Sequence, residues 1–167
     1  MPEKTIFVVD GHALCYRAYF ALQRNPLINS KGQNVSAIYG FFRMLLRLLQ
    51  TQKPDYTIIA FDPPKKSFRF SMYPEYKAQR AKMPDDLRSQ IEEIKAILQE
   101  MGFTVVIMDD YEADDVLGSI ARQYSDSYKV VLVTGDKDAY QLLSDKNVSI
   151  YAGKKGIDRK STRLNSS

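Results

Sequence analysis

Short apolar runs alternate with longer segments of helical periodicity along most of this chain, and this alternation constrains its fold most strongly. The apolar runs are rich in β-branched and aromatic residues and are predicted to be buried strands at 5–9, 56–61, 103–108, 129–134 and 147–151. Helices are predicted between them, at 13–22, 36–50, 84–101, 116–124 and 137–143. Strands and helices that alternate in this way predict an α/β fold with a mainly parallel central sheet flanked by helices.

The composition fits one globular domain. The chain has 167 residues, of which 44% are hydrophobic and 26% charged, which is ordinary for a protein with a sizeable core. No apolar run approaches the roughly 20 residues that span a bilayer, so we expect a cytoplasmic protein without membrane contact. The single cysteine, Cys15, excludes an internal disulfide and is expected to pack as a small hydrophobe. The single histidine, His12, is expected to be a turn or packing residue.

We place the domain over residues 1–152. Beyond residue 152 the chain is basic and rich in serine, without helical or strand periodicity. Residues 153–167 are therefore expected to be a disordered or non-native tail.

Acidic residues gather at the ends of the predicted strands and ahead of one helix. The seven candidate metal ligands are Asp10, Asp62, Glu112, Asp114, Asp115, Asp136 and Asp138. A helix N-terminus alone favours acids by roughly 0.3–1 kcal/mol each, which is a purely structural explanation for the three that precede residues 116–124. Because the carboxyl ends of parallel strands share one edge of a sheet, we nevertheless expect these carboxylates to converge on one crevice.

So many carboxylates can share a crevice only if cations neutralise them or several of their pKa values rise. Ligands that are all oxygen suit Mg²⁺ or Mn²⁺ rather than Zn²⁺, and the number of acids indicates two ions. Two such ions can activate a water, orient a phosphodiester and stabilise its leaving oxygen. The chain has no glycine-rich phosphate loop of the Walker type, so a nucleotide-driven motor or a kinase is not expected.

Basic and aromatic residues alternate through residues 65–84 without a good amphipathic pattern. One interpretation is a solvated loop or irregular helix whose rings pack on the body, and the other is a clamp that stacks bases on rings and holds phosphates with cations. The pattern does not decide between them. The candidate DNA-binding residues are Lys65, Lys66, Arg69, Tyr73, Tyr76 and Lys82.

Five motifs carry a resemblance to a known family. They are residues 8–12 (VVDGH), 61–62 (FD), 67–69 (SFR) with the bases and rings that follow, 111–115 (YEADD) and 134–138 (TGDKD). In this order and spacing they resemble the 5′ nuclease domains of bacterial DNA polymerases I, which belong to the flap endonuclease family. The resemblance runs from about residue 6 to residue 151.

The resemblance implies a PIN-like flap endonuclease fold and a metal-dependent 5′-3′ exonuclease and flap endonuclease, which acts on DNA with a single-stranded 5′ end or flap in primer removal and repair. It assigns metal binding to the seven acids and makes residues 65–84 an arch over the single strand. Lys77 and Arg80 match arch residues that contact the scissile phosphate, and Arg17 matches a phosphate-binding position. It also implies a monomer, with a polymerase domain on a longer chain.

The family continues with two further aspartate ligands and a helix-turn-helix-like element that grips duplex DNA, and this chain shows neither. We therefore expect a fold truncated at the C-terminus and impaired cleavage. Two alternatives stay open: a DNA-binding chain that does not cut, and a PIN-like ribonuclease, which shares the acidic sheet edge but does not need the arch.

Overall fold

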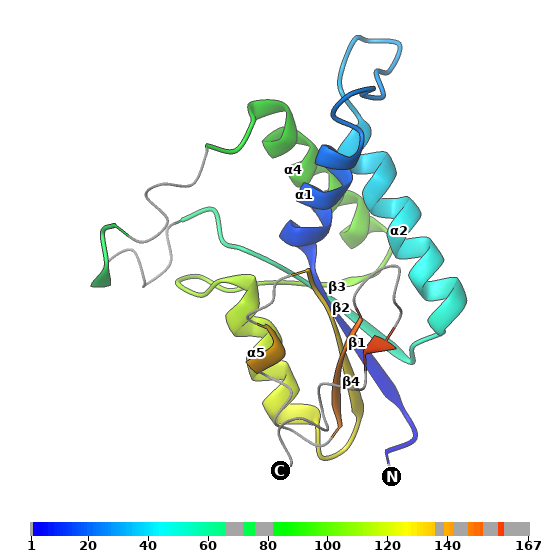
Figure 1. The fold of residues 1–167 in the computed structure, drawn as a ribbon, viewed down its shortest axis with the longest axis vertical. Helices are drawn as coiled ribbons and strands as arrows, with labels where there is room; N and C mark the ends of the chain where they lie inside the picture. The colour runs from blue at the N-terminus through cyan, green and yellow to red at the C-terminus, as the bar shows by residue number, and fades with distance from the viewer. Residues whose placement is uncertain are drawn as a thin grey trace.

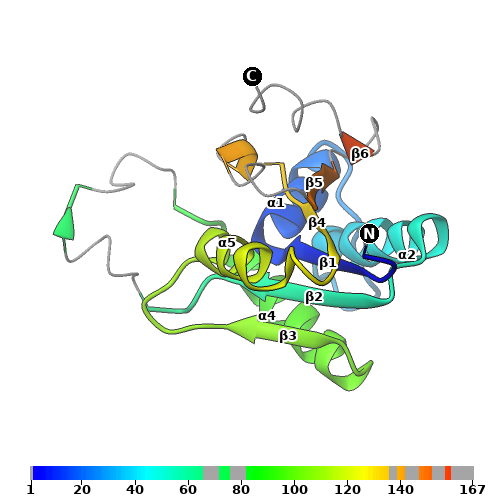
Figure 2. The same ribbon diagram turned by 90° about the horizontal axis from the view of Figure 1, so that it is seen from below.

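A mostly parallel sheet forms the centre of the protein. The structure is a computed structural model, and it describes residues 2–65, 72–75, 82–135, 139–141 and 147–151, with the backbone of 157–158. The strands are β1 (Thr5–Asp10), β2 (Tyr56–Phe61), β3 (Thr104–Ile107), β4 (Lys129–Val133), β5 (Val148–Tyr151) and β6 (Ile157–Asp158). They lie side by side in the order β3-β2-β1-β4-β5-β6 (Figure 2). All neighbours from β3 to β5 pair in parallel, and β6 runs antiparallel to β5.

Helices cover both faces of this sheet. They are α1 (Gly11–Ala21), α2 (Ser36–Gln52), α4 (Asp85–Glu100) and α5 (Ala113–Tyr124). Figure 1 shows α1, α2 and α4 on one face and α5 on the other. The predicted α/β fold class, with its mainly parallel sheet between helices, is therefore confirmed. Within the described part of the chain, no helix combines the length and apolar character needed to cross a membrane.

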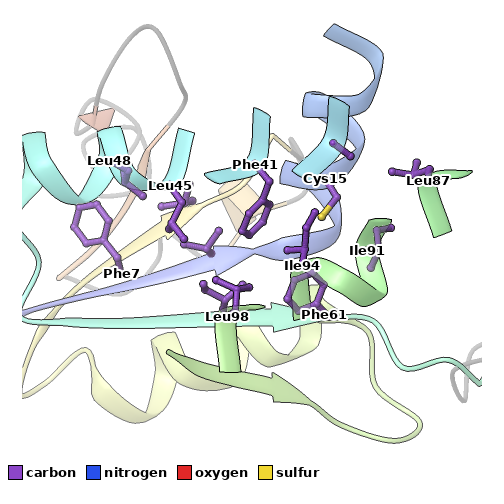
Figure 3. Close-up of a cluster of buried hydrophobic side chains, with 14 of the residues drawn as sticks. Phe7, Cys15, Phe41, Leu45, Leu48, Phe61, Leu87, Ile91, Ile94 and Leu98 are labelled. Carbon is purple, nitrogen blue, oxygen red and sulfur yellow. The ribbon is translucent and has the colours of Figure 1, made fainter. Parts of the chain in front are cut away.

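The strands alternate their side chains between two hydrophobic cores. On β1, Phe7 and Val9 face the core under α1, α2 and α4, whereas Ile6 and Val8 face the core under α5. The first core also contains Cys15, which is fully buried as the sequence predicts (Figure 3). Burial, with a smaller contribution from the nearby carboxylate of Asp10, raises the pKa of the Cys15 thiol well above its usual range. The thiol is therefore a packing group.

The chain order of the strands creates one crevice at the carboxyl edge of the sheet. From β1 the chain moves outward through β2 to β3, and then returns to place β4 on the other side of β1. The helices that follow β1 and β4 in such a fold leave toward opposite faces, so the sheet opens between these strands beyond their carboxyl ends. Asp10 is the last residue of β1, which places it at this switch point.

Several element boundaries differ from the sequence expectation. The first helix begins at Gly11 rather than at residue 13, and α5 begins at Ala113 rather than at residue 116, because acidic side chains bond to the free N–H groups of both first turns. Within the expected helix 137–143 the structure describes only residues 139–141, which form a 3₁₀ turn. In the expected tail, Ile157–Asp158 pair with β5, while most of 153–167 lies outside the described residues, so the domain boundary stays a prediction.

Candidate functional site

Asp10 links the end of β1 to the start of α1. Its backbone is extended, and its Oδ1 atom accepts a hydrogen bond from the backbone N–H of Ala13 at 3.1 Å, which caps the helix. Its Oδ2 atom lies 3.5 Å from the hydroxyl Oγ1 of Thr134, which follows β4. Only 7% of Asp10 is exposed. A nearly buried carboxylate is thus held between the two strands that flank the switch point.

Gly11 lets this turn pass close to the neighbouring strand. A Cβ atom at this position would lie 2.6 Å from the ring of Phe61 and 2.9 Å from the backbone oxygen of Ala60, both in β2. Such distances are too short for any side chain without movement of its neighbours. The pair Asp10-Gly11 therefore combines an acid with the absence of a side chain that the close approach of α1 to β2 requires.

Asp62 follows the last residue of β2 and connects α1 with α5. Its carboxylate Oδ1 accepts a hydrogen bond of 2.7 Å from the backbone N–H of Ala113, the first residue of α5. Its own backbone N–H donates to the ring atom Nδ1 of His12 at 2.9 Å. Asp62 is half-buried, and its backbone and its side chain are each held by a different helix.

Glu112 and Asp115 form a reciprocal cap at the start of α5. The Glu112 side chain accepts from the backbone N–H of Asp115, and the backbone N–H of Glu112 donates to Asp115 Oδ2 at 2.9 Å. Glu112 is 7% exposed, Asp115 is half-buried and Asp114 is exposed. The structural explanation that the sequence offers for this cluster, helix capping, is therefore real, and it also fixes the direction of two carboxylates.

Two of the described acids each contact a residue from another part of the carboxyl edge. Asp62 reaches α5 through Ala113, beside Glu112, while Asp10 reaches the end of β4 through Thr134. Among the described residues, no three histidine, cysteine or acidic side chains lie close enough to hold a metal ion by themselves. Asp136 and Asp138, which follow Thr134 and Gly135, lie outside the described residues. The donors are all carboxylate oxygens, which fits Mg²⁺ or Mn²⁺ in its chemistry, and the convergence of all seven stays a prediction.

A cavity of about 510 Å³ opens beside the acidic edge, on the side of α1 and α2. Thr134 and Gly135 form one wall, so the cavity reaches the partner of Asp10. Arg17 from α1 and Arg47 from α2 also line it, and both are exposed. Arg17 therefore lines a cavity beside Thr134, and its predicted role toward phosphate stays a prediction. Arg47 is a second cation in this lining, although its helical pattern predicts only a solvated surface residue.

Residues 63–84, which contain the predicted arch segment, connect Asp62 to the start of α4. Lys65, Tyr73 and Lys82 are exposed, and Tyr73 exposes 71% of its surface. The remaining predicted residues of this segment, Lys66, Arg69, Tyr76, Lys77 and Arg80, lie outside the described residues. The exposure of Tyr73 is against the interpretation in which this ring packs on the body. The DNA-binding interpretation of the segment stays a prediction.

The start of α4, which follows the predicted arch segment, is anchored by polar contacts that local sequence patterns do not predict. Asp86 accepts hydrogen bonds from the Tyr19 hydroxyl at 2.9 Å and from the Asn34 amide at 3.0 Å. The side chain of Gln90 is buried and accepts hydrogen bonds from the backbone N–H groups of Ala37 and Ile38 in the first turn of α2. The N-cap residue of α2, Val35, makes no side-chain hydrogen bond to this turn. Desolvation, and then the bond to Asp86, raise the pKa of Tyr19.

Comparisons with known proteins agree with this arrangement. The profile of the family described as "5′-3′ exonuclease, N-terminal resolvase-like domain" matches residues 5–165. DNA polymerase I of Deinococcus radiodurans is 48% identical over 154 residues, which are 90% of this chain and 16% of that protein. The 5′-3′ exonuclease of Aquifex aeolicus is 43% identical over 143 residues, which are 85% of this chain and 49% of that protein. The chain thus spans half or less of the length of these relatives.

Solved structures show the same fold. A T5 5′-exonuclease with bound zinc ions superposes with a TM-score of 0.66 at 24% identity, covering 92% of this chain and 56% of the other. A bacteriophage T5 flap endonuclease in a complex with DNA and metal ions gives a TM-score of 0.64 at 23% identity, with the same coverage. The parallel sheet, the acids at its carboxyl edge and the family profile lead to one conclusion: this chain belongs to the 5′-3′ exonuclease family and carries its N-terminal, resolvase-like domain.

Proposed function

We propose that this chain carries the metal-dependent site of a 5′ nuclease, which hydrolyses phosphodiester bonds at the 5′ ends and flaps of DNA. The observation that carries the proposal is the placement of Asp10 and Asp62. They lie at the carboxyl ends of adjacent parallel strands, and each accepts a hydrogen bond from the first turn of a helix at the carboxyl edge of the sheet. The names of the relatives, a 5′-3′ exonuclease and a T5 flap endonuclease with DNA and metal ions, support the same activity.

The metal would be Mg²⁺ or Mn²⁺, as two ions, because the donors are hard oxygens. The residues that would hold it are Asp10, Asp62, Glu112 and Asp115, with Asp114, Asp136 and Asp138. Bound ions would lower the pKa of a water and offset the charge of the phosphodiester. The part played by the chain is rigidity: the bonds from Ala13 to Asp10 and from Ala113 to Asp62 keep the carboxylates oriented before any ligand arrives.

Cations of the chain would hold the phosphates. Arg17 lies beside the acidic edge in the cavity wall, and Lys77 and Arg80 belong to the arch segment that starts just after Asp62. In the sequence, acids that would bind cations are thus followed by bases that would bind the DNA backbone. Lys65, Tyr73 and Lys82, all exposed, would contact the single strand through charge and stacking.

The names of the relatives support a proposal for the cellular role. Because similar sequences occur in proteins named DNA polymerase I, we propose that this domain works with a polymerase domain in primer removal and repair. We propose a monomer in the cytoplasm, in contact with DNA and not with a membrane.

A cleavage assay with two nucleic acids tests the proposal. The chain is incubated with end-labelled 5′-flap DNA and with single-stranded RNA, each in Mg²⁺, Mn²⁺ or EDTA. The expected result is cleavage of the flap DNA, at whatever rate, that stops in EDTA and in the variant Asp115→Asn. Asp126→Asn serves as the matched control, because Asp126 is exposed just after α5, away from the acidic edge.

The same assay separates the alternatives. Cleavage of RNA but not of flap DNA would indicate a ribonuclease and would contradict the proposal. Binding of flap DNA without any cleavage in either metal would indicate a DNA-binding chain that does not cut. Cleavage by Asp115→Asn at the rate of the unchanged protein would overturn the assignment of this acid.

A further inference from the structure

We propose that His12 is a positioning residue for the metal ligand Asp62, an inference that rests on the proposed function. The sequence predicts His12 only as a turn or packing residue. In the structure its Nδ1 atom accepts a hydrogen bond from the backbone N–H of Asp62 at 2.9 Å, across 50 residues of chain. His12 therefore acts on the site through another residue.

The direction of this bond determines the form of the imidazole. A backbone amide can only donate, so Nδ1 must carry the lone pair and the proton of the neutral ring must lie on Nε2. Asp62 follows the last residue of β2, so its N–H lies just beyond the strand. The bond to His12 satisfies a donor that would otherwise depend on water or on movement of the chain.

Two further contacts hold the imidazole ring in place. His12 is the second residue of α1, directly after the close contact that requires Gly11. Its ring also meets the fully buried ring of Phe61 edge to face, with centroids 5.6 Å apart and an angle of 71°. Because α1 and the Phe61 ring both constrain the imidazole, its Nδ1 atom can hold the Asp62 backbone at a defined position beyond the end of β2.

Both strand-end acids are therefore positioned by the same helix, α1. Asp10 caps α1 through Ala13, and Asp62 is tied to α1 through His12. The bond from Ala113 to the Asp62 carboxylate then fixes its side chain. Without the His12 acceptor, the side chain of Asp62 would keep its bond to α5, but its backbone would no longer be held by the helix that Asp10 caps.

A pair of substitutions of similar shape isolates the acceptor. In His12→Asn the side-chain oxygen Oδ1 can take the place of Nδ1, whereas in His12→Leu a methyl group takes that place and cannot accept. Both side chains are shorter than histidine and lose a similar part of the contact with Phe61. A difference between the two variants therefore reports the hydrogen bond.

The test measures metal affinity and the bond itself. Mn²⁺ is titrated calorimetrically into the protein and both variants, and the exchange rate of the Asp62 amide hydrogen is measured by NMR. We expect His12→Leu to weaken Mn²⁺ binding by roughly 10- to 100-fold and to speed exchange of the Asp62 amide. His12→Asn should stay within about threefold of the unchanged protein in affinity, and its Asp62 amide should stay protected.

A measurement on the unchanged protein needs no variant to fold. The two-bond ¹H–¹⁵N spectrum of His12 should show protonated Nε2 and unprotonated Nδ1, and the opposite tautomer would overturn the inference. Equal Mn²⁺ affinity or equal Asp62 exchange in His12→Leu and His12→Asn would also overturn it. If the unchanged protein binds no Mn²⁺ while its Asp62 amide is protected, the proposed function fails, and the role of His12 toward a metal fails with it.

Discussion

The two ends of the central sheet are built from different chemistry. At the amino end, the rings of Tyr56 and Tyr124 both pack against Tyr128, with centroids 5.8 and 5.9 Å away, and Lys4 lies over the Tyr56 ring. At the carboxyl end, the side chains at or directly after the last residues of β1, β2 and β4 are Asp10, Asp62 and Thr134. Between these ends, the central strands β1 and β4 are largely apolar and buried.

The difference lies in what the polar groups bond to. At the amino end, rings contact rings, and the exposed carboxylate of Asp55 accepts a hydrogen bond of 2.8 Å from the backbone N–H of Thr5, the first residue of β1. At the carboxyl end, carboxylates accept from the first N–H groups of helices, as Asp62 does from Ala113. An ionised carboxylate offers about four lone-pair sites, so a single N–H bond orients Asp62 and leaves it able to bind a cation. The contacts at the amino end therefore contribute stability, and those at the carboxyl end would orient acids for the proposed metal ion.

The largest effect is expected at the carboxyl end. Asp62→Asn keeps an oxygen that can accept from Ala113 but removes the charge, so we expect Mn²⁺ affinity to fall more than about 100-fold, which is about 2.7 kcal/mol. The free energy of unfolding in urea without metal should change little. Calorimetric titration measures the first quantity, and Asp126→Asn is the control of equal charge change. Equal Mn²⁺ affinity in Asp62→Asn and the control would remove Asp62 from the site.

The matching change at the amino end should affect stability alone. Tyr128→Ala removes two edge-on ring contacts together with apolar contact area, so the free energy of unfolding should fall by about 2–3 kcal/mol. Urea unfolding measures this free energy. Tyr128→Phe should keep most of the stability of the unchanged protein, because both ring contacts remain. Mn²⁺ affinity should not change in the folded variant. A loss of affinity in Tyr128→Ala would show that the two ends are coupled.

Gly11 should link stability to the site. In Gly11→Ala the new methyl group meets the Phe61 ring and the Ala60 backbone, so we expect a loss of about 1–3 kcal/mol in the free energy of unfolding. Weaker Mn²⁺ binding should accompany it, because α1 and the Asp10 cap must shift. Gly135→Ala is the steric control for stability, since a Cβ there meets no atom of the described residues within 4 Å. Equal stability of the two variants would contradict the close approach of α1 to β2.

The smallest expected effect concerns the hydrogen bond from Tyr19 to Asp86, an acid that is not at the carboxyl edge. The neutral Tyr19 hydroxyl donates to Asp86, and its pKa is raised above 10, so this contribution to stability is full below pH 10 and is lost as the pH rises through the folded pKa. Urea unfolding between pH 8 and pH 11 should show a steeper loss in the unchanged protein than in Tyr19→Phe. Parallel curves would show that the bond does not contribute.

Local patterns predicted most of the fold. Strands and helices follow from periodicity, because each buries one stripe or face, and the acids at strand ends follow from their position after β1 and β2. The contacts that arrange the site could not be predicted, because His12 meets Asp62 across 50 residues and Tyr19 meets Asp86 across 67. Such contacts depend on how helices settle on the sheet, and neither residue type nor spacing records that.

The proposed divalent ion binds at the carboxyl end of the sheet and not elsewhere. Mn²⁺ is paramagnetic and broadens the NMR signals of nearby nuclei, and the two ends of a six-residue strand lie about 17 Å apart. We predict that substoichiometric Mn²⁺ broadens the amide signals of Ala13, Ala113 and Gly135 while those of Tyr56 and Lys129 stay sharp, and that Asp62→Asn abolishes the broadening. Broadening centred on the amino end, or none at the carboxyl end at millimolar Mn²⁺, would contradict this account.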